Sequence, residues 1–337
     1  MPRPAVIAGA VSAAVAIAAA SGGAFAGCAG NSSGHQHDPG SAPRSASPLY
    51  SPFTGERVAR LDRVLALKID NIVYARPQTG LTHADIIYVE PVEGGLSRFL
   101  AVFSSHFPRV IGPVRSARAE DMQILSQFGR PAFAWSGAQP HLVPVVEHAH
   151  VVDLYAGLAG GYFRGTNRIA PYNLYAQTSK LLAESRRASI AHDIGFRFGA
   201  APAGGKPTRS FSIRYPSASF SFRWTPAQQR WRVWMDGAPA RTTDAGQMGP
   251  PTVVIQYVHV AKSERFLEHG SPPPYAESVG HGTAVVLRDG RAYRGHWSRP
   301  TAHGGTIYTL PNGQRMTFTR GQVWVVLAFG PGSTWHL

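Results

Sequence analysis

Two arginines flank the predicted start of a helix in Ile111–Asp121, which reads I-G-P-V-R-S-A-R-A-E-D. Ser116 is a favourable N-cap, because its hydroxyl can accept a hydrogen bond from the free N–H groups of a first helical turn. Apolar residues then recur at helical spacing as far as Phe128, which predicts a helix over this stretch. Arg115 precedes the cap and Arg118 falls in the first turn.

Cations at a helix N-terminus oppose the helix dipole, whereas an anion bound there is stabilised. The sequence therefore predicts an anion site at Ser116, with Arg115 and Arg118 as a clamp. The alternative is local neutralisation, since Glu120 and Asp121 follow within one turn and Arg118 and Asp121 form an i,i+3 pair. The sequence leaves both interpretations open.

Further polar residues stand where predicted strands end. Asp70 and Asn71 close the strand Val64–Asp70, Glu93 lies in a Gly-rich turn, and Arg98 opens the strand that follows. Ends of neighbouring strands meet at one rim of a sheet, where ligands tend to bind. Asp70 and Glu93 could therefore act as an acid–base pair beside the arginines. Alternatively, these residues form ordinary ion pairs on a solvated rim.

The elements that must position these residues divide into two regions. Over 51–205 the predicted strands Val64–Asp70, Ala84–Val89, Arg98–Phe103 and 131–136 are interleaved with predicted helices at 139–148 and 178–191. This pattern predicts a mixed α/β N-terminal domain. A Pro/Gly-rich break at 202–207 precedes a region, 206–337, in which apolar residues alternate. That region predicts a predominantly antiparallel β domain, so the fold class is α+β.

The β region has its own signals. Asp236-Gly237, Asp289-Gly290 and Asn312-Gly313 are hairpin-turn dipeptides. Its tryptophans and interspersed arginines could stack on bases or sugars, but at strand alternation the aromatic residues are more often core. Nucleic acid is disfavoured as a partner, since no known reader motif is present.

The first 50 residues read as a targeting segment and a spacer. Residues 1–27 carry Arg3 and then an apolar run, which is typical of a secretory signal peptide. Cys28, the sole cysteine, follows Ala-Gly and resembles the lipid-modified residue of a bacterial lipobox. Ordinary cleavage after residue 26 is the alternative. Residues 28–50 are rich in Gly, Ser, Pro and Ala and predict a flexible tether.

Composition narrows the class of protein and its partners. The chain has 337 residues, 33 Lys and Arg against 19 Asp and Glu, and a formal charge of +14. This balance favours anionic partners, such as phospholipid or wall polymers. A single cysteine excludes an internal disulfide. No cofactor motif and no metal-ligand spacing is present, so we expect neither.

Several of these runs together resemble a known family. They are Lys68–Asn71, Ala75–Leu81, Ala84–Tyr88, Val92–Ala101 and Ile111–Arg118, with Ser51–Gly55, Arg168–Tyr175 and His296–Pro300 as further matches. The chain is similar to the YerB-like lipoproteins, which carry domain of unknown function 3048. The resemblance implies a surface-anchored, two-domain protein and no established activity. Tyr172 departs from the family, where a histidine often stands.

The residues favour one function over two alternatives. We expect an exported protein, lipid-anchored through Cys28 at the outer face of the cytoplasmic membrane, that binds or scaffolds an anionic envelope ligand. The predicted ligand-binding residues are Asn71, Arg98, Arg115, Ser116 and Arg118. One alternative is an envelope hydrolase or transferase that uses Asp70 or Glu93. The other is a structural partner of envelope proteins.

Overall fold

The computed structural model describes residues 48–263 and 272–330. The predicted signal peptide, Cys28 and the predicted tether as far as residue 47 therefore lie outside the described residues. Within the described ranges, strands dominate and α-helices are few and short.

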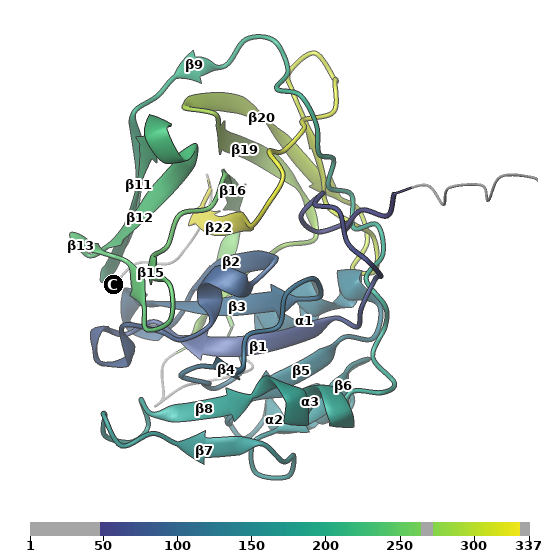
Figure 1. The fold of residues 1–337 in the computed structure, drawn as a ribbon, viewed down its shortest axis with the longest axis vertical. Helices are drawn as coiled ribbons and strands as arrows, with labels where there is room; N and C mark the ends of the chain where they lie inside the picture. The colour runs from purple at the N-terminus through teal and green to yellow at the C-terminus, as the bar shows by residue number, and fades with distance from the viewer. Residues whose placement is uncertain (1–47, 264–271, 331–337) are drawn as a thin grey trace, which may run out of the picture. The chain divides into compact units, whose positions relative to one another are not determined.

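A mixed sheet of eleven strands forms the centre of the described residues, in the order β21-β20-β19-β16-β22-β2-β3-β1-β5-β6, with β9 paired to β20 (Figure 1). Its strands from the first half of the chain are β1 (Leu65–Asp70), β2 (Ile86–Pro91), β3 (Ser97–Phe103), β5 (Ala132–Trp135) and β6 (Val152–Tyr155). Those from the second half are β9 (Lys206–Pro207), β16 (Thr252–Val258), β19 (Gly280–Arg288), β20 (Arg291–Arg299), β21 (Ile307–Thr309) and β22 (Val323–Phe329).

Smaller elements surround this sheet. An antiparallel sheet contains β10 (Ser210–Tyr215), β11 (Ala218–Thr225), β12 (Arg230–Met235) and β13 (Ala238–Pro239). A three-stranded sheet contains β4 (Val110–Ile111), β8 (Leu174–Gln177) and β7 (Tyr162–Arg164). Two strand pairs are β14 (Arg241–Thr242) with β15 (Gly246–Gln247), and β17 (Val260–Lys262) with β18 (Pro274–Ala276). The α-helices are α1 (Ala119–Leu125), α2 (Val143–Glu147) and α3 (Thr178–Glu184), and the 3-10 turns are η1 (Val73–Ala75), η2 (Leu81–His83), η3 (Glu93–Gly95), η4 (Ser126–Phe128) and η5 (Pro226–Gln228).

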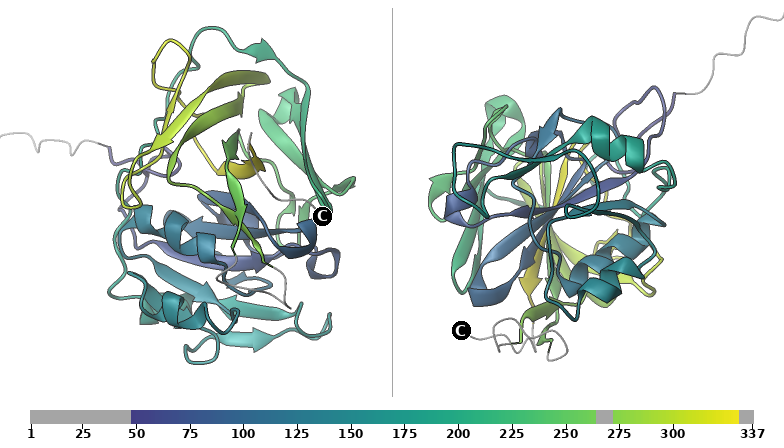
Figure 2. Two further views of the ribbon diagram at one scale, coloured as in Figure 1. Left: turned by 180° about the vertical axis from the view of Figure 1, so that it is seen from behind. Right: turned by 90° about the horizontal axis from the view of Figure 1, so that it is seen from below.

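The central strands are buried on both faces, as expected for strands inside a layered core. One apolar cluster joins alternate residues of β1–β3 to α1 and η4, for example Leu100 to Ile124. The other joins the opposite residues to β11 and β12, for example Phe99 to Phe220. The antiparallel sheet that contains β11 and β12 therefore covers one face of the central sheet, and α1 covers the opposite face (Figure 2).

The two predicted regions meet inside this sheet. β2 pairs in parallel with β22, with Ile86 beside Val323, and contacts place the described residues in one compact unit. The domain boundary near residue 205 therefore stays a prediction, and strands from both regions lie in the same sheet. The predicted β-rich character of 206–337 agrees with its strands, and the mixed α/β character of 51–205 is not confirmed.

Two predicted helices are shorter than expected. The helix predicted over 178–191 ends at Glu184, because the residues beyond it pair with strands: Ser189 N–H donates to Arg130 and Val64 N–H donates to Ser189. The helix predicted over 139–148 is reduced to α2. In the first case, backbone pairing with distant segments outweighs local helix propensity.

Candidate functional site

The predicted rim is assembled by the pairing of β1, β2 and β3. Asp70 on β1 lies opposite Arg98 on β3, and Arg98 lies opposite Glu90 on β2. Glu93 lies in η3, the turn that joins β2 to β3. The structure therefore brings the predicted acidic and basic residues together at these strand ends.

Both predicted clamp arginines are matched by a carboxylate. Arg115 Nε lies 2.8 Å from Asp70 Oδ2, and Arg118 Nη2 lies 2.7 Å from Glu93 Oε2. The Arg118 side chain is 6% exposed and that of Arg115 is 25% exposed. Burial alone would raise the pKa of Glu93, but the charge of Arg118 holds it below its usual value. Asp70 and Glu93 are thus ion-pair partners of the two arginines.

Arg98 lies among these pairs. Its Nη1 donates to the carbonyl of Ser116 at 3.4 Å, and its Nε is buried without a hydrogen-bond partner among the described residues. Burial, together with the charge of Arg118, lowers the pKa of Arg98 to about 10. Arg98 therefore contributes a buried positive charge to the rim.

The prediction that Ser116 caps the helix is wrong. Helix α1 begins at Ala119, and Arg118 is its N-cap residue, in extended conformation with φ −128° and ψ 160°. The Arg118 N–H donates to Asp121 Oδ2 at 2.6 Å, so a carboxylate in the first turn satisfies the cap. A bound anion is not needed to complete this helix terminus.

The Asn71 side chain is engaged in hydrogen bonds with neighbouring residues. Its Nδ2 donates to Ser97 Oγ at 2.9 Å, and its Oδ1 accepts from Gln78 Nε2 at 2.9 Å and from Arg76 Nε at 3.2 Å. The side chain is buried. These bonds fix the turn that follows β1.

A buried charge cluster lies behind the rim. Lys68 Nζ lies 2.7 Å from Asp121 Oδ1 and also forms an ion pair with Glu90. Glu120 is buried beside them and affects the pKa of both Lys68 and Glu90. Three carboxyl groups therefore share one ammonium group in the protein interior.

The excess of acid changes the protonation of this cluster. Burial, with the charge of Asp121, raises the pKa of Glu90 well above its usual range, and burial raises that of Glu120 to about 8. Burial by itself would lower the pKa of Lys68, but Asp121 and Glu90 raise it above its usual value. The cluster thus holds a charged Lys68, while Glu90 and Glu120 retain protons near neutral pH.

Sequence reasoning missed this cluster, although a signal was present. Lys68 lies on the same face of β1 as Val64 and Ala66, and Glu90 lies on the same face of β2 as Tyr88. A charged residue at an inward position of a buried strand must be paired.

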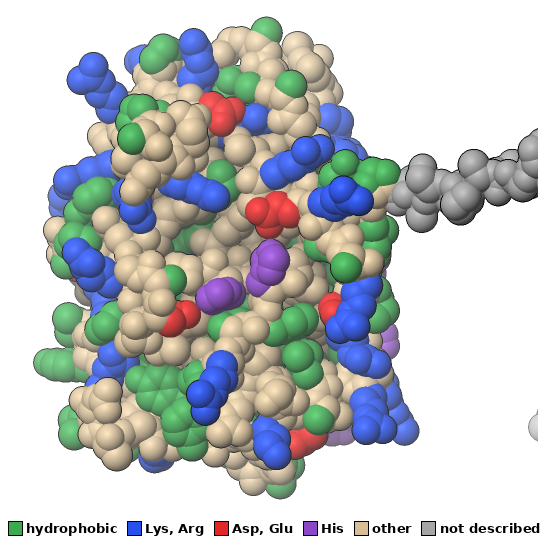
Figure 3. Space-filling view, in the orientation of Figure 1, with side chains coloured by type: hydrophobic (Ala, Val, Ile, Leu, Met, Phe, Trp, Pro, Cys, Tyr) green, Lys and Arg blue, Asp and Glu red, His purple; other side chains and the backbone are tan. Residues whose placement is uncertain are grey.

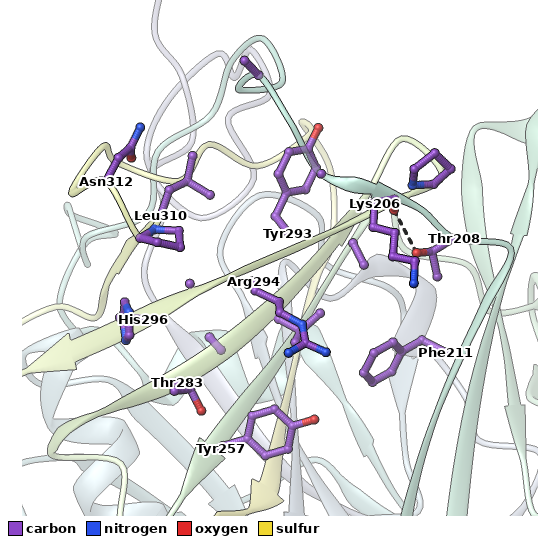
Figure 4. A pocket seen from close by; sticks show the side chains of 18 of the residues that line it. Lys206, Thr208, Phe211, Tyr257, Thr283, Tyr293, Arg294, His296, Leu310 and Asn312 are labelled. Carbon is purple, nitrogen blue, oxygen red and sulfur yellow. Dashed lines mark hydrogen bonds between the residues drawn. The ribbon is translucent and has the colours of Figure 1, made fainter.

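A second candidate site is a large groove in the second half of the chain (Figure 4). It has a volume of about 1560 Å³ and lies between β9 and β10 on one side and β19 and β20 on the other. The segment 203–208 is tied over β20: Lys206 and Pro207 pair with it, and Arg291 donates to Gly205 O at 2.8 Å. The Thr208 hydroxyl also donates to Lys206 O at 2.9 Å.

Three basic and several aromatic side chains are among those that line this groove. We call it the basic-aromatic groove after Lys206, Arg209, Arg294, Phe211, Tyr257 and Tyr293. In Figure 4 the Arg294 guanidinium reaches into the space between Tyr257 and Phe211. No Asp or Glu lies among the lining residues, and none of the three cations has an ion-pair partner in the described part of the chain. The groove is therefore positively charged.

The groove was not predicted, but its ingredients are visible in the sequence. Interspersed aromatic and arginine residues were interpreted as a core and a solvated face. Trp231, Trp297 and Trp324 are indeed buried. Neighbouring residues on β20 face opposite ways, so Tyr293 is buried while Arg294 is exposed.

Neither a candidate metal cluster nor a membrane-spanning helix is found among the described residues. In residues 48–263 and 272–330, no cluster of three or more His, Cys, Asp and Glu side chains could hold a metal ion. No helix in those ranges is both long enough and apolar enough to span a bilayer.

Comparisons with known proteins agree over most of the chain. Residues 53–191 match the N-terminal domain, and residues 211–325 the C-terminal domain, of the protein of unknown function DUF3048. The chain is 26% identical over 303 residues to "Putative lipoprotein YerB" of Bacillus subtilis (strain 168), which covers 85% of this chain and 88% of that protein. The crystal structure of the Bacillus subtilis YerB protein matches with a TM-score of 0.72 at 19% identity, over 83% of this chain and 96% of that one.

The two domain models match consecutive parts of the chain in the order that defines the family, and together they cover more than half of it. The solved structure shows that the fold is shared. The chain therefore belongs to the YerB-like family, which is defined by the N- and C-terminal domains of DUF3048.

Proposed function

We propose that this protein is exported, is anchored through a lipid on Cys28, and binds a segment of an anionic envelope polymer in the basic-aromatic groove. The signal-peptide pattern and the position of the sole cysteine support the anchor. The name of the Bacillus subtilis relative, a lipoprotein, supports it as well. Several acyl chains stabilise anchoring by about 0.8 kcal/mol per buried CH₂, which suffices without a transmembrane helix.

The charge of the groove is the observation that carries the binding proposal. Lys206, Arg209 and Arg294 line it without an acidic neighbour among the lining residues. Elsewhere, basic side chains are spread over the surface, as Figure 3 shows for one face, with acidic side chains among them. Cations that converge in a concave site without counter-charges favour an anionic ligand.

Size and apolar surface narrow the ligand further. Small-molecule pockets typically measure roughly 300–1,000 Å³, so about 1560 Å³ favours an extended ligand. Phe211 and Tyr257, which are half-buried, offer apolar faces to the carbon skeleton of such a chain. A polymer of sugars or polyols that carries phosphate or carboxylate groups has both properties, and such polymers occur on the outer side of bacterial membranes.

The strand rim supports this function less well. An anion at Arg115 or Arg118 would have to displace Asp70 or Glu93 from ion pairs of 2.8 and 2.7 Å. The predicted use of these arginines for binding therefore remains a secondary proposal. The predicted hydrolase or transferase gains no support from the rim, because Asp70 and Glu93 are already engaged as ion-pair partners.

The test uses charge reversal with a matched control. Arg294→Glu changes the groove, and Arg214→Glu makes the same change at an exposed position of β10 outside the groove lining. Binding of the purified full-length protein to poly(glycerol phosphate), polygalacturonate and neutral dextran is measured by calorimetry. We expect binding to an anionic polymer that Arg294→Glu weakens by about tenfold or more, while Arg214→Glu changes it little.

The outcomes separate ligand chemistry from diffuse charge. Binding of the phosphate polymer alone, or of the carboxylate polymer alone, identifies the anionic group. Equal weakening by the two variants would mean that overall charge, rather than the groove, attracts polymers, and the proposal would fail. Absence of binding to both anionic polymers would also overturn it.

A further inference from the structure

Three large apolar side chains are exposed on two neighbouring loops, η1 and the segment between β7 and β8. Val73 and Tyr74, in η1, are 63% and 65% exposed, and Ile169, between β7 and β8, is 76% exposed. Single exposed apolar residues are ordinary, but a group of them indicates an interaction surface.

Hydrogen bonds hold both loops in place. The Arg168 guanidinium donates to Ala75 O at 3.0 Å and to Pro77 O at 2.7 Å, which ties the second loop to the first. The buried Asn173 side chain donates to Gly165 O at 2.8 Å and to Arg168 O at 2.9 Å, which closes the second loop. The loops are thus fixed by polar contacts, while the apolar side chains remain outside.

Two tyrosine rings join the two loops. The rings of Tyr74 and Tyr172 lie 5.7 Å apart with an interplanar angle of 35°. The Arg115 guanidinium carbon lies 5.9 Å from the centre of the Tyr172 ring. We call Val73, Tyr74, Ile169 and Tyr172 the tyrosine platform. Rigid aromatic anchors beside arginine are the usual composition of protein-binding hot spots.

Charge around the platform indicates what it would bind. Arg168 borders it, and the exposed Arg164 donates to Asn173 Oδ1 beside it. Neither arginine forms an ion pair within the described residues, whereas Arg115 is already paired with Asp70. The carboxylate nearest to Arg115 belongs to Asp70, whose side chain is only 5% exposed. The border therefore presents positive charge to a partner, which fits carboxylates that flank an apolar side chain.

A glycan fits this surface less well than a polypeptide. Sugar rings stack on flat aromatic faces, whereas the aliphatic Val73 and Ile169 are among the exposed side chains here. Aliphatic side chains on both loops complement the apolar side chains of a peptide.

We infer that the tyrosine platform docks an acidic polypeptide segment with apolar anchor residues, supplied by another protein of the envelope. None of its residues lines the basic-aromatic groove, so the two surfaces could be occupied together.

The test selects a phage-displayed library of random dodecapeptides on the full-length protein. The platform variant carries Tyr74→Ser and Ile169→Ser. The control is Leu158→Ser, which removes a residue that is 83% exposed outside the platform. We expect the recovered peptides to contain Asp or Glu beside large apolar residues. They should bind the platform variant about tenfold more weakly than the wild type and bind the control variant equally well.

Thermal melting of both variants checks the fold, and we expect unchanged midpoints because the substituted side chains are exposed. The proposal is overturned by failure to recover peptides, by recovery of basic peptides, or by equal binding to the platform variant. Soluble wall-glycan fragments form the second arm. Glycan binding that only the platform variant loses would assign the surface to glycans instead.

Discussion

The Nε atom of Arg115 lies 2.8 Å from Oδ2 of Asp70 and thereby ties the segment before α1 to the end of β1. Asp70 is almost wholly buried in this pair, while Arg115 keeps one side open toward the ring of Tyr172. The arginine therefore has two roles in the structure. It neutralises a buried carboxylate, and its guanidinium group lies against the ring of Tyr172 at the edge of the tyrosine platform.

The Arg118–Glu93 pair should contribute to stability. Removing one partner of a buried pair leaves the other charge uncompensated, which typically costs about 3 kcal/mol. We expect Arg118→Ala to lower the unfolding free energy by about this amount, and addition of Glu93→Gln to restore part of it. Urea denaturation measures both, with Arg294→Ala as an exposed control that should change stability by less than about 0.5 kcal/mol. If Arg118→Ala also lowered the unfolding free energy by less than about 0.5 kcal/mol, a structural role for the pair would be excluded.

Lys68 should be the most sensitive charged residue of the core. Its ammonium group contacts the carboxyl groups of both Glu90 and Asp121, and all three side chains are fully buried. We expect Lys68→Met to cost about 3–5 kcal/mol, measured by urea denaturation. Adding Glu90→Gln should recover part of the loss, because it removes one uncompensated carboxyl group. If the double variant is less stable than Lys68→Met, the carboxyl groups do not depend on Lys68 as the geometry indicates.

Glu120 should make stability depend on pH. Its pKa is raised from 4.5 to about 8, so between these values the folded state retains a proton that the unfolded state has lost. Its contribution is therefore fully present below about pH 4.5 and is lost as the pH rises through about 8. We expect the unfolding free energy to fall between pH 5 and 8, and Glu120→Gln to flatten this slope. Denaturation at several pH values compares the variant with the wild type; equal slopes would exclude Glu120 as the titrating group.

Cys28 should control membrane attachment. If the cysteine carries the lipid, Cys28→Ala should move the protein from the membrane fraction to the soluble exported fraction. Fractionation followed by immunoblotting measures the change, and Ser32→Ala, within the predicted tether, is a control that should leave attachment unaltered. A Cys28→Ala protein that remains in the membrane fraction would contradict lipid anchoring.

Local sequence patterns predicted most strands. The strand expected at Val64–Asp70 is β1, Leu65–Asp70, and Asp289-Gly290 forms a turn in which both residues have positive φ. These features depend on side-chain alternation and on turn chemistry, which neighbouring residues determine. The helix ends were predicted less well, because Ser189 bonds to distant backbone groups.

The sequence by itself determined the family, the pattern of strands and the gathering of charged residues at the ends of β1, β2 and β3. Only the tertiary structure decided which charges neutralise each other. From the sequence alone, an arginine could pair with any of several carboxylates. Strand register and the path of the loop bring Asp70 next to Arg115. The same holds for the basic-aromatic groove: its lining comes from segments far apart in the chain, and pairs such as β9 with β20 bring these segments together.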